Sequence, residues 1–105
     1  MKDVMELIDR DSSVPAGADF ALVLDDDCLS PAAKKGQKVF ISCSQQLSEG
    51  EAGVFLYQDR VFCRRWQEDY SGALILLPGR SASAEPVYIP KAERQSCLCL
   101  GKILL

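Results

Sequence analysis

Residues 50–66 read GEAGVFLYQDRVFCRRW, and this stretch decides the fold class. It holds two apolar runs, 53–57 and 60–66, which are joined by the polar pair Gln58–Asp59. Short apolar runs joined by a two-residue polar step are typical of a β-hairpin, and Asp59 suits the turn although the usual glycine is absent. We therefore expect an antiparallel hairpin at the centre of the chain.

Further short apolar runs lie on both sides of this hairpin and are separated by turn residues. They cover residues 20–24, 38–43, 73–77, 87–89 and 96–105. Residues 70–72 indicate a second hairpin, 31–35 a short helical turn, and Gly101 a bulge or a close backbone contact. The pattern at Val4–Ile8 fits a strand or a helical turn equally well. The chain is therefore predicted to be mostly β, with about seven short strands and one short helical turn.

Size and charge limit the classes of function. A chain of 105 residues makes one domain, and its hydrophobic fraction of 48% is ordinary for a globular protein. The net charge of -3 and the lack of a basic run argue against binding of nucleic acid by this chain alone. Acidic residues interrupt Met1–Arg10, and no apolar stretch is long enough to span a membrane. We therefore expect a cytoplasmic protein without a membrane partner.

The chain has five cysteines and no histidine. Without an export signal, reduced thiols in a reducing cytosol are expected. No CxxC pair is present, so a zinc site is weakly supported, and no metal or cofactor is predicted. Four cysteines in strand-like runs are expected to pack in the core: Cys43, Cys63, Cys97 and Cys99. The acidic run Asp25–Asp27 is expected to form a solvated turn or a helix cap rather than a metal site.

Residues 18–31, ADFALVLDDDCLSP, resemble a segment of the LexA and phage-repressor peptidase family. Members of that family have a strand that starts with an Ala-Asp-Phe-like step, then Gly-Asp-Ser-Met-x-Pro, and then a Gly-Asp that begins the next strand. Here Cys28 stands at the position of the nucleophilic serine, and Pro31 matches the proline. Asp26 replaces the family's glycine, Asp27 matches its aspartate, and Gly36 matches the later glycine.

Residues 50–66 extend the resemblance, because they are similar to the family's Gly-Asp-Ile-Gly-Val-Phe hairpin. The second strand of that hairpin carries the lysine general base, and this lysine falls on Arg64. Residues 100–104 resemble the family's closing Gly-x-Val strand. The resemblance implies a lead-in segment at 1–17 and a LexA C-terminal, or signal-peptidase-like, β domain at 18–105. The pair Ala16–Gly17 looks like the family's scissile bond but is interpreted as an ordinary turn, since it directly precedes a strand.

Cys28 and Arg64 are thus the candidate catalytic residues, and the resemblance implies that the family's Ser/Lys dyad is lost. A buried lysine can lose its proton and act as a base, whereas an arginine stays protonated. No lysine lies on residues 60–66 that could act as the base in place of Arg64. The alternative is a reactive thiol, because a guanidinium stabilises a thiolate, although Asp25–Asp27 oppose this by like-charge repulsion.

The function implied by the resemblance is a regulatory or dimerisation module of a transcriptional regulator. A homodimer is expected, and residues 97–105 are either an unpaired apolar edge for it or an ordinary buried core strand. DNA would be bound only through a helix-turn-helix domain, which this sequence does not contain. The alternatives are an active LexA-type peptidase, which cleaves itself in a longer parent or acts through Cys28, and a small-molecule or peptide binder with Tyr57 and Trp66 as cleft aromatics.

Overall fold

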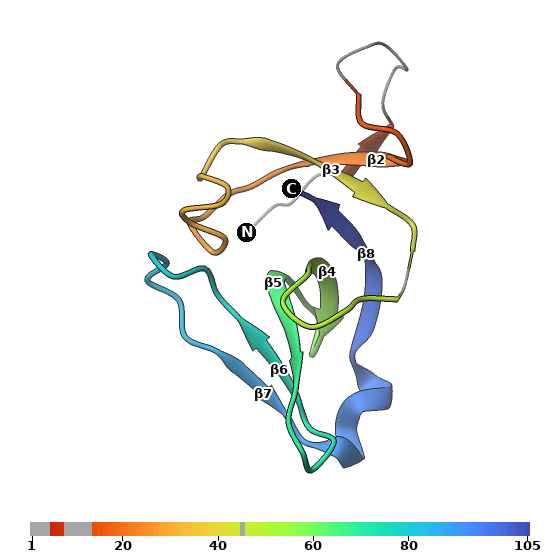
Figure 1. Ribbon diagram of the computed structural model, residues 1–105, viewed down its shortest axis with the longest axis vertical. Helices are drawn as coiled ribbons and strands as arrows, with labels where there is room; N and C mark the ends of the chain where they lie inside the picture. Colours follow the sequence, from red (N-terminus) through yellow and green to blue (C-terminus); the bar gives the residue numbers. More distant parts are fainter. Residues whose placement is uncertain (1–4, 8–13, 45) are drawn as a thin grey trace.

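The computed structural model describes residues 5–7, 14–44 and 46–105, and the fold is mostly β, as predicted (Figure 1). One antiparallel sheet holds its strands in the order β1-β2-β3-β8-β4-β5-β6-β7. The strands are β1 (Met5–Leu7), β2 (Phe20–Val23), β3 (Lys38–Ser42), β4 (Ala52–Tyr57), β5 (Arg60–Glu68), β6 (Leu74–Leu77), β7 (Val87–Ile89) and β8 (Leu98–Leu104), and a single 3-10 helix, η1, covers Lys91–Ser96.

The central hairpin is confirmed. Its strands β4 and β5 pair from Ala52–Arg65 to Tyr57–Arg60. Gln58 and Asp59 form the turn with φ angles of 52° and 61°. Positive φ at both central residues is the geometry that matches the twist of a two-residue hairpin. The second expected hairpin, around residues 70–72, joins β5 and β6.

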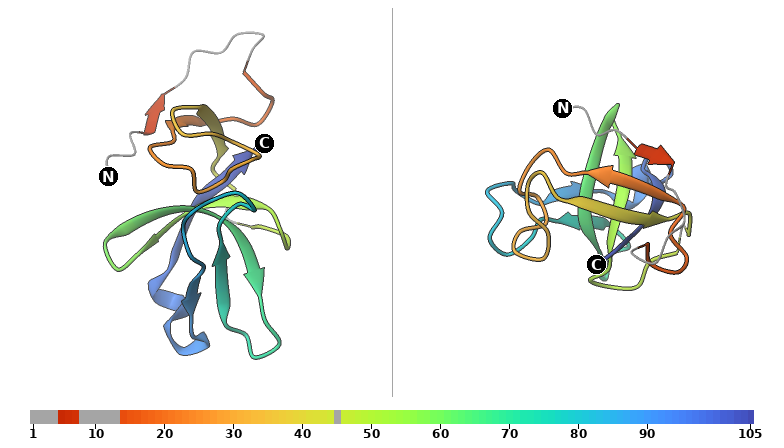
Figure 2. Two further views of the ribbon diagram at one scale, coloured as in Figure 1. Left: turned by 90° about the vertical axis from the view of Figure 1, so that its left-hand side faces the viewer. Right: turned by 90° about the horizontal axis from the view of Figure 1, so that it is seen from above.

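The β4–β5 hairpin is buried on both faces, which explains the continuous apolar run in β4. Ala52 and Val54 face one group of buried side chains, and Phe55 and Tyr57 face another. The first group, here the β2–β3 cluster, comprises Leu22, Leu24, Cys28, Leu29, Ala33, Val39, Ile41, Ala52, Val54, Cys63 and Ile103. The second group, here the β6–β7 cluster, comprises Phe55, Tyr57, Phe62, Leu74, Leu76 and Ile89. Figure 2 shows that β2 and β3 cross over the β4–β5 hairpin, so the sheet curls around these clusters.

Strand β8 lies in the middle of the sheet. It pairs with β3 through Lys102–Leu104 and with β4 through Leu98–Lys102. The expectation of an unpaired edge at 97–105 is therefore wrong, and among the described strands β1 and β7 end the sheet. The close contact expected at Gly101 is confirmed, because a Cβ there would come within 2.6 Å of both Ile41 Cγ2 and Ser42 O.

The helical turn expected at 31–35 is also wrong, since these residues form irregular turns. Ala32 and Ala33 both donate their N–H groups to Leu29 O, but the N–H of Lys34 goes to the Gln37 side chain, so no helical ladder continues. The helical segment is η1 instead. It follows Pro90, whose φ of -57° is already that of a helix.

Three smaller expectations have clear outcomes. Residues Met5–Leu7 form a strand, whereas Val4 and Ile8 lie outside the described residues. The turn at 15–17 is confirmed by the hydrogen bond from Ala18 N to Pro15 O, at 3.2 Å. Cys63 is buried as expected, but Cys43 is exposed because β3 ends one residue before it.

Within the described part of the chain, no helix is long and apolar enough to cross a membrane.

Candidate functional site

The loop between β2 and β3 carries Cys28, the residue matched to the family's nucleophile. Cys28 is only 2% exposed and belongs to the β2–β3 cluster. Its N–H donates to Asp26 Oδ1 at 2.9 Å, which forms a local turn of the kind expected for the acidic run. The thiol is therefore held inward by a short loop with its own internal hydrogen bonds.

A second loop fixes this segment from outside. Gly79 donates its N–H to Cys28 O at 2.7 Å, and Ser81 donates to Ser30 O at 3.0 Å. A Cβ on Gly79 would lie 2.1 Å from Ser30 O, so only glycine permits this approach. No local sequence pattern predicts this contact, because Pro78–Gly79 has the composition of any loop.

Arg64, the residue matched to the family's lysine base, lies on β5 and is only 7% exposed. Its Nη1 donates to Cys63 O at 3.0 Å, and its guanidinium lies 5.5 Å from the centre of the Phe62 ring. Its Nε is buried and has no hydrogen-bond partner among the described residues. Burial of a charged group with an unsatisfied donor is costly, so this arginine is an unusual feature of the core.

Cys28 and Arg64 line one small cavity of about 30 Å³, although they are far apart in the sequence. Other walls come from the β2–β3 loop and β5, including Leu24, Asp26, Phe62 and Cys63. Burial by itself raises the pKa of Asp26. Hydrogen bonds from the Cys28 side chain and N–H, with the charges of Arg64 and Lys35, outweigh this effect and leave the pKa below its ordinary value of 3.8.

This arrangement limits the chemistry at Cys28. The Cys28 side chain hydrogen-bonds the neighbouring Asp26 carboxylate, and only 2% of Cys28 is exposed to a substrate or reagent. Arg64 offers only donors and cannot take up a proton. A cavity of about 30 Å³ has room for roughly one water molecule and not for a peptide bond with its flanking residues.

The two aromatic residues suggested for a cleft lie away from this cavity. Tyr57 is buried in the β6–β7 cluster, and its hydroxyl donates to Glu93 Oε1 at 2.9 Å, which raises the pKa of the phenol. Trp66 lines a separate and larger cavity of about 450 Å³, together with Cys97 and Cys99. Sequence reasoning placed these two cysteines in the core and missed the cavity, because residues from a loop, four strands and a turn form it.

No group of three or more His, Cys, Asp or Glu side chains that could hold a metal ion occurs among the residues that the structure describes. A comparison of the sequence with models of known protein families finds no match. A comparison with curated protein sequences finds no significant match either.

Proposed function

We propose that this chain is a LexA-type peptidase-fold domain that acts as a regulatory or dimerisation module and lacks Ser/Lys self-cleavage. One observation carries the proposal. Cys28 and Arg64, which the resemblance assigns independently to the nucleophile and base positions, line the same buried cavity. Two residues that match a dyad by sequence alone would have no reason to meet unless the surrounding fold were also similar.

The geometry around both residues supports the loss of activity. Arg64 lies against Phe62 and bonds the Cys63 carbonyl, so it fills the position of a base without an acceptor atom. Cys28 is enclosed by its own loop and by Gly79. Both side chains therefore serve packing in this proposal, and the regulatory role rests on association with other chains.

Alkylation with iodoacetamide, followed by peptide mass spectrometry, tests the inactive site. Cys43 is the internal reference because it is exposed, although partial burial and the Asp19 carboxylate raise its pKa. We expect Cys28 to react at least about tenfold more slowly than Cys43 in the folded protein, and at a similar rate in urea. Faster reaction at Cys28 than at Cys43 would favour the thiol-based peptidase instead.

Sedimentation analysis tests the association. The proposed module is expected to form a dimer whose fraction rises with protein concentration. Because β8 is paired on both sides, this dimer must use a surface other than an open β8 edge. A strict monomer at high concentration would contradict the dimerisation role and leave the Cys28 measurement unaffected.

A further inference from the structure

The larger cavity combines apolar walls with two thiols. Its volume is about 450 Å³, and it lies beside the β6–β7 cluster. The apolar walls come from β4, β5, β6 and the loop before β4, and comprise Leu47, Phe55, Trp66 and Leu74. The polar lining comes from Gln46 and Arg94, and the two sulfur atoms of Cys97 and Cys99 are the only soft ligands among the lining residues. A cavity with apolar walls and a few grouped polar atoms is the usual form of a ligand site.

The backbone places both thiols on the same side. Cys97 follows η1 in an extended conformation, with φ -103° and ψ 116°, and Cys99 lies in β8. Side chains two residues apart in extended chain point to the same face. Burial raises the pKa of both thiols. The proximity of Cys99 raises that of Cys97 further, whereas Arg94 opposes the rise.

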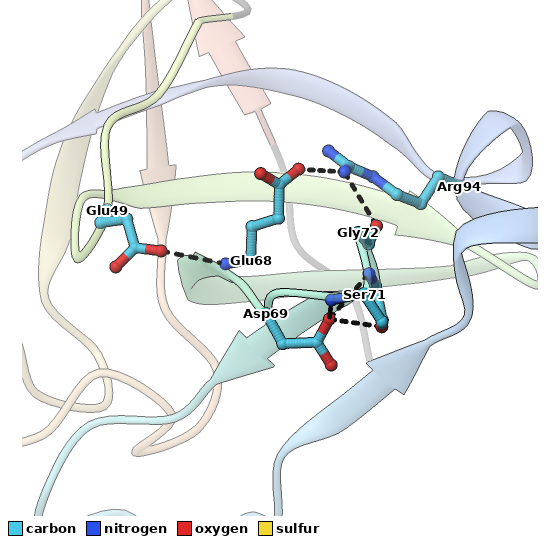
Figure 3. Close-up of polar contacts among 7 residues, drawn as sticks. Glu49, Glu68, Asp69, Ser71, Gly72 and Arg94 are labelled. Atoms are coloured by element: carbon cyan, nitrogen blue, oxygen red, sulfur yellow. Dashed lines mark hydrogen bonds and ion pairs between the residues drawn. The ribbon is translucent and has the colours of Figure 1, made fainter.

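Arg94 fixes the segment that precedes the first thiol. Figure 3 shows its guanidinium between β5 and the β5–β6 turn. It forms an ion pair with Glu68 and donates to Gly72 O at 3.0 Å. The hydroxyl of Tyr57 bonds Glu93 in the same turn, at 2.9 Å. These three contacts hold η1 in place, so the position of Cys97 is set before any ligand arrives.

We propose that Cys97 and Cys99 form a two-coordinate site for a soft monovalent metal ion of the Cu⁺ class. Thiolates select soft ions, and a site whose paired ligands are two sulfur atoms disfavours ions that need several oxygen ligands. Zinc in structural sites takes four ligands, and the cavity supplies two. On binding, the ion forms two metal–sulfur bonds and two protons leave to solvent. The resulting complex carries one negative charge, which lies beside the Arg94 guanidinium.

The distances suit such a complex. Two residues of extended chain span about 6.7 Å, and two metal–thiolate bonds of about 2.3 Å require sulfur atoms about 4.6 Å apart. Rotation of the two side chains about χ1 can bring the sulfur atoms to this separation without a change in the backbone. Cys99 Sγ now lies 3.7 Å from Gly101 O, and this weak contact is given up on binding.

The single tryptophan of the chain gives a direct readout, because Trp66 lines this cavity. The probe is Ag⁺ in chloride-free buffer, added to the Cys43→Ser variant so that the exposed thiol does not compete. We expect quenching of Trp66 fluorescence that saturates at one equivalent. Adding Cys97→Ser or Cys99→Ser removes a direct ligand and should weaken the affinity by about a hundredfold or more. Unchanged quenching in both variants, or equally tight binding of Zn²⁺, would overturn the proposal.

A second measurement needs no substitution at the ligands. One equivalent of Cu⁺, added anaerobically to the unsubstituted protein, should protect Cys97 and Cys99 together from alkylation by iodoacetamide. Cys43 is the control and should remain reactive, since it lies outside the cavity. Protection of neither cysteine, or of one alone, would contradict a two-coordinate site even if the serine variants failed to fold.

Discussion

The two thiol-containing cavities of this molecule differ in almost every physical respect. Cys28 lies in a cavity of about 30 Å³, enclosed by two loops that hydrogen-bond each other. Cys97 and Cys99 line a cavity of about 450 Å³, between strands and a short helical turn. The smaller cavity holds a buried cation and a carboxylate, whereas the larger one combines four apolar side chains with Gln46, Arg94 and the two thiols. The cysteine that resembles a nucleophile is thus tightly enclosed, whereas space for a ligand lies beside two other cysteines.

The largest expected difference between the two regions is in packing. Leu29 is fully buried beside Cys28, and Leu47 is partly buried on the wall of the larger cavity. Leu29→Ala should lower the free energy of unfolding by about 3 kcal/mol, because the enclosed site cannot collapse. Leu47→Ala should cost about 1 kcal/mol, since it enlarges an existing cavity. Urea unfolding measures both, and equal losses would show that the two regions are packed alike.

The second largest effect on stability is expected where the loop at Gly79 contacts the loop at Cys28. Gly79→Ala would place a Cβ against the backbone of Leu29 and Ser30, and should cost about 2 kcal/mol in the free energy of unfolding. Gly36→Ala is the matched control, because Gly36 has a positive φ of 84° but open space around its Cα. That variant should cost about 1 kcal/mol through backbone strain alone. A smaller loss for Gly79→Ala than for Gly36→Ala would contradict the tight approach of the two loops.

The smallest effect concerns charge in the Cys28 cavity. Because the folded protein lowers the pKa of Asp26 below its ordinary value of 3.8, ionised Asp26 stabilises the fold above that value. This contribution is lost as the pH falls through the lower folded pKa. After screening by solvent it amounts to about 0.5 kcal/mol or less. The difference in stability between the protein and Asp26→Asn should therefore shrink between pH 6 and pH 2, as measured by urea unfolding.

Arg64→Met serves as the check on that prediction. This substitution removes the guanidinium that helps to lower the pKa of Asp26. The pKa of the Asp26 carboxyl, measured by NMR titration, should therefore rise. An unchanged pKa of Asp26 would mean that the charge of Arg64 does not act on the Asp26 carboxylate, although both residues line the same cavity.

Local pattern was sufficient to predict most of the strands. The apolar runs and their polar breaks place the central hairpin and the strand at 87–89, because these depend on neighbouring residues. The helical turn was misplaced, although Pro90 followed by strong helix formers at Lys91–Gln95 was a usable signal. Strand order cannot be predicted in this way, because an apolar run such as 97–105 looks alike at an edge and at the centre of a sheet.

The candidate sites, like the strand order, depend on contacts between residues that are far apart in the sequence. That Cys28 and Arg64 share a cavity was reached only through the resemblance, since residues on different strands meet through long-range pairing. The loop contact of Gly79 and the stacking of Arg64 on Phe62 had no local signal. The cavity at Cys97 and Cys99 depends on a loop, four strands and a turn, and no short motif encodes such an arrangement.

The central place of β8 has a consequence for how the protein is made. Among the described strands, β3 and β4 do not pair with each other, so backbone pairing between the two halves of the sheet runs through β8. On a translating ribosome, β2–β3 and β4–β7 emerge first and cannot complete the sheet until Leu98–Leu104 leaves the exit tunnel. Until then, the strand edges on either side of the gap are open to pairing with other nascent chains. Correct folding of this domain is therefore expected to begin with the hairpins during synthesis and to finish only after β8 is released.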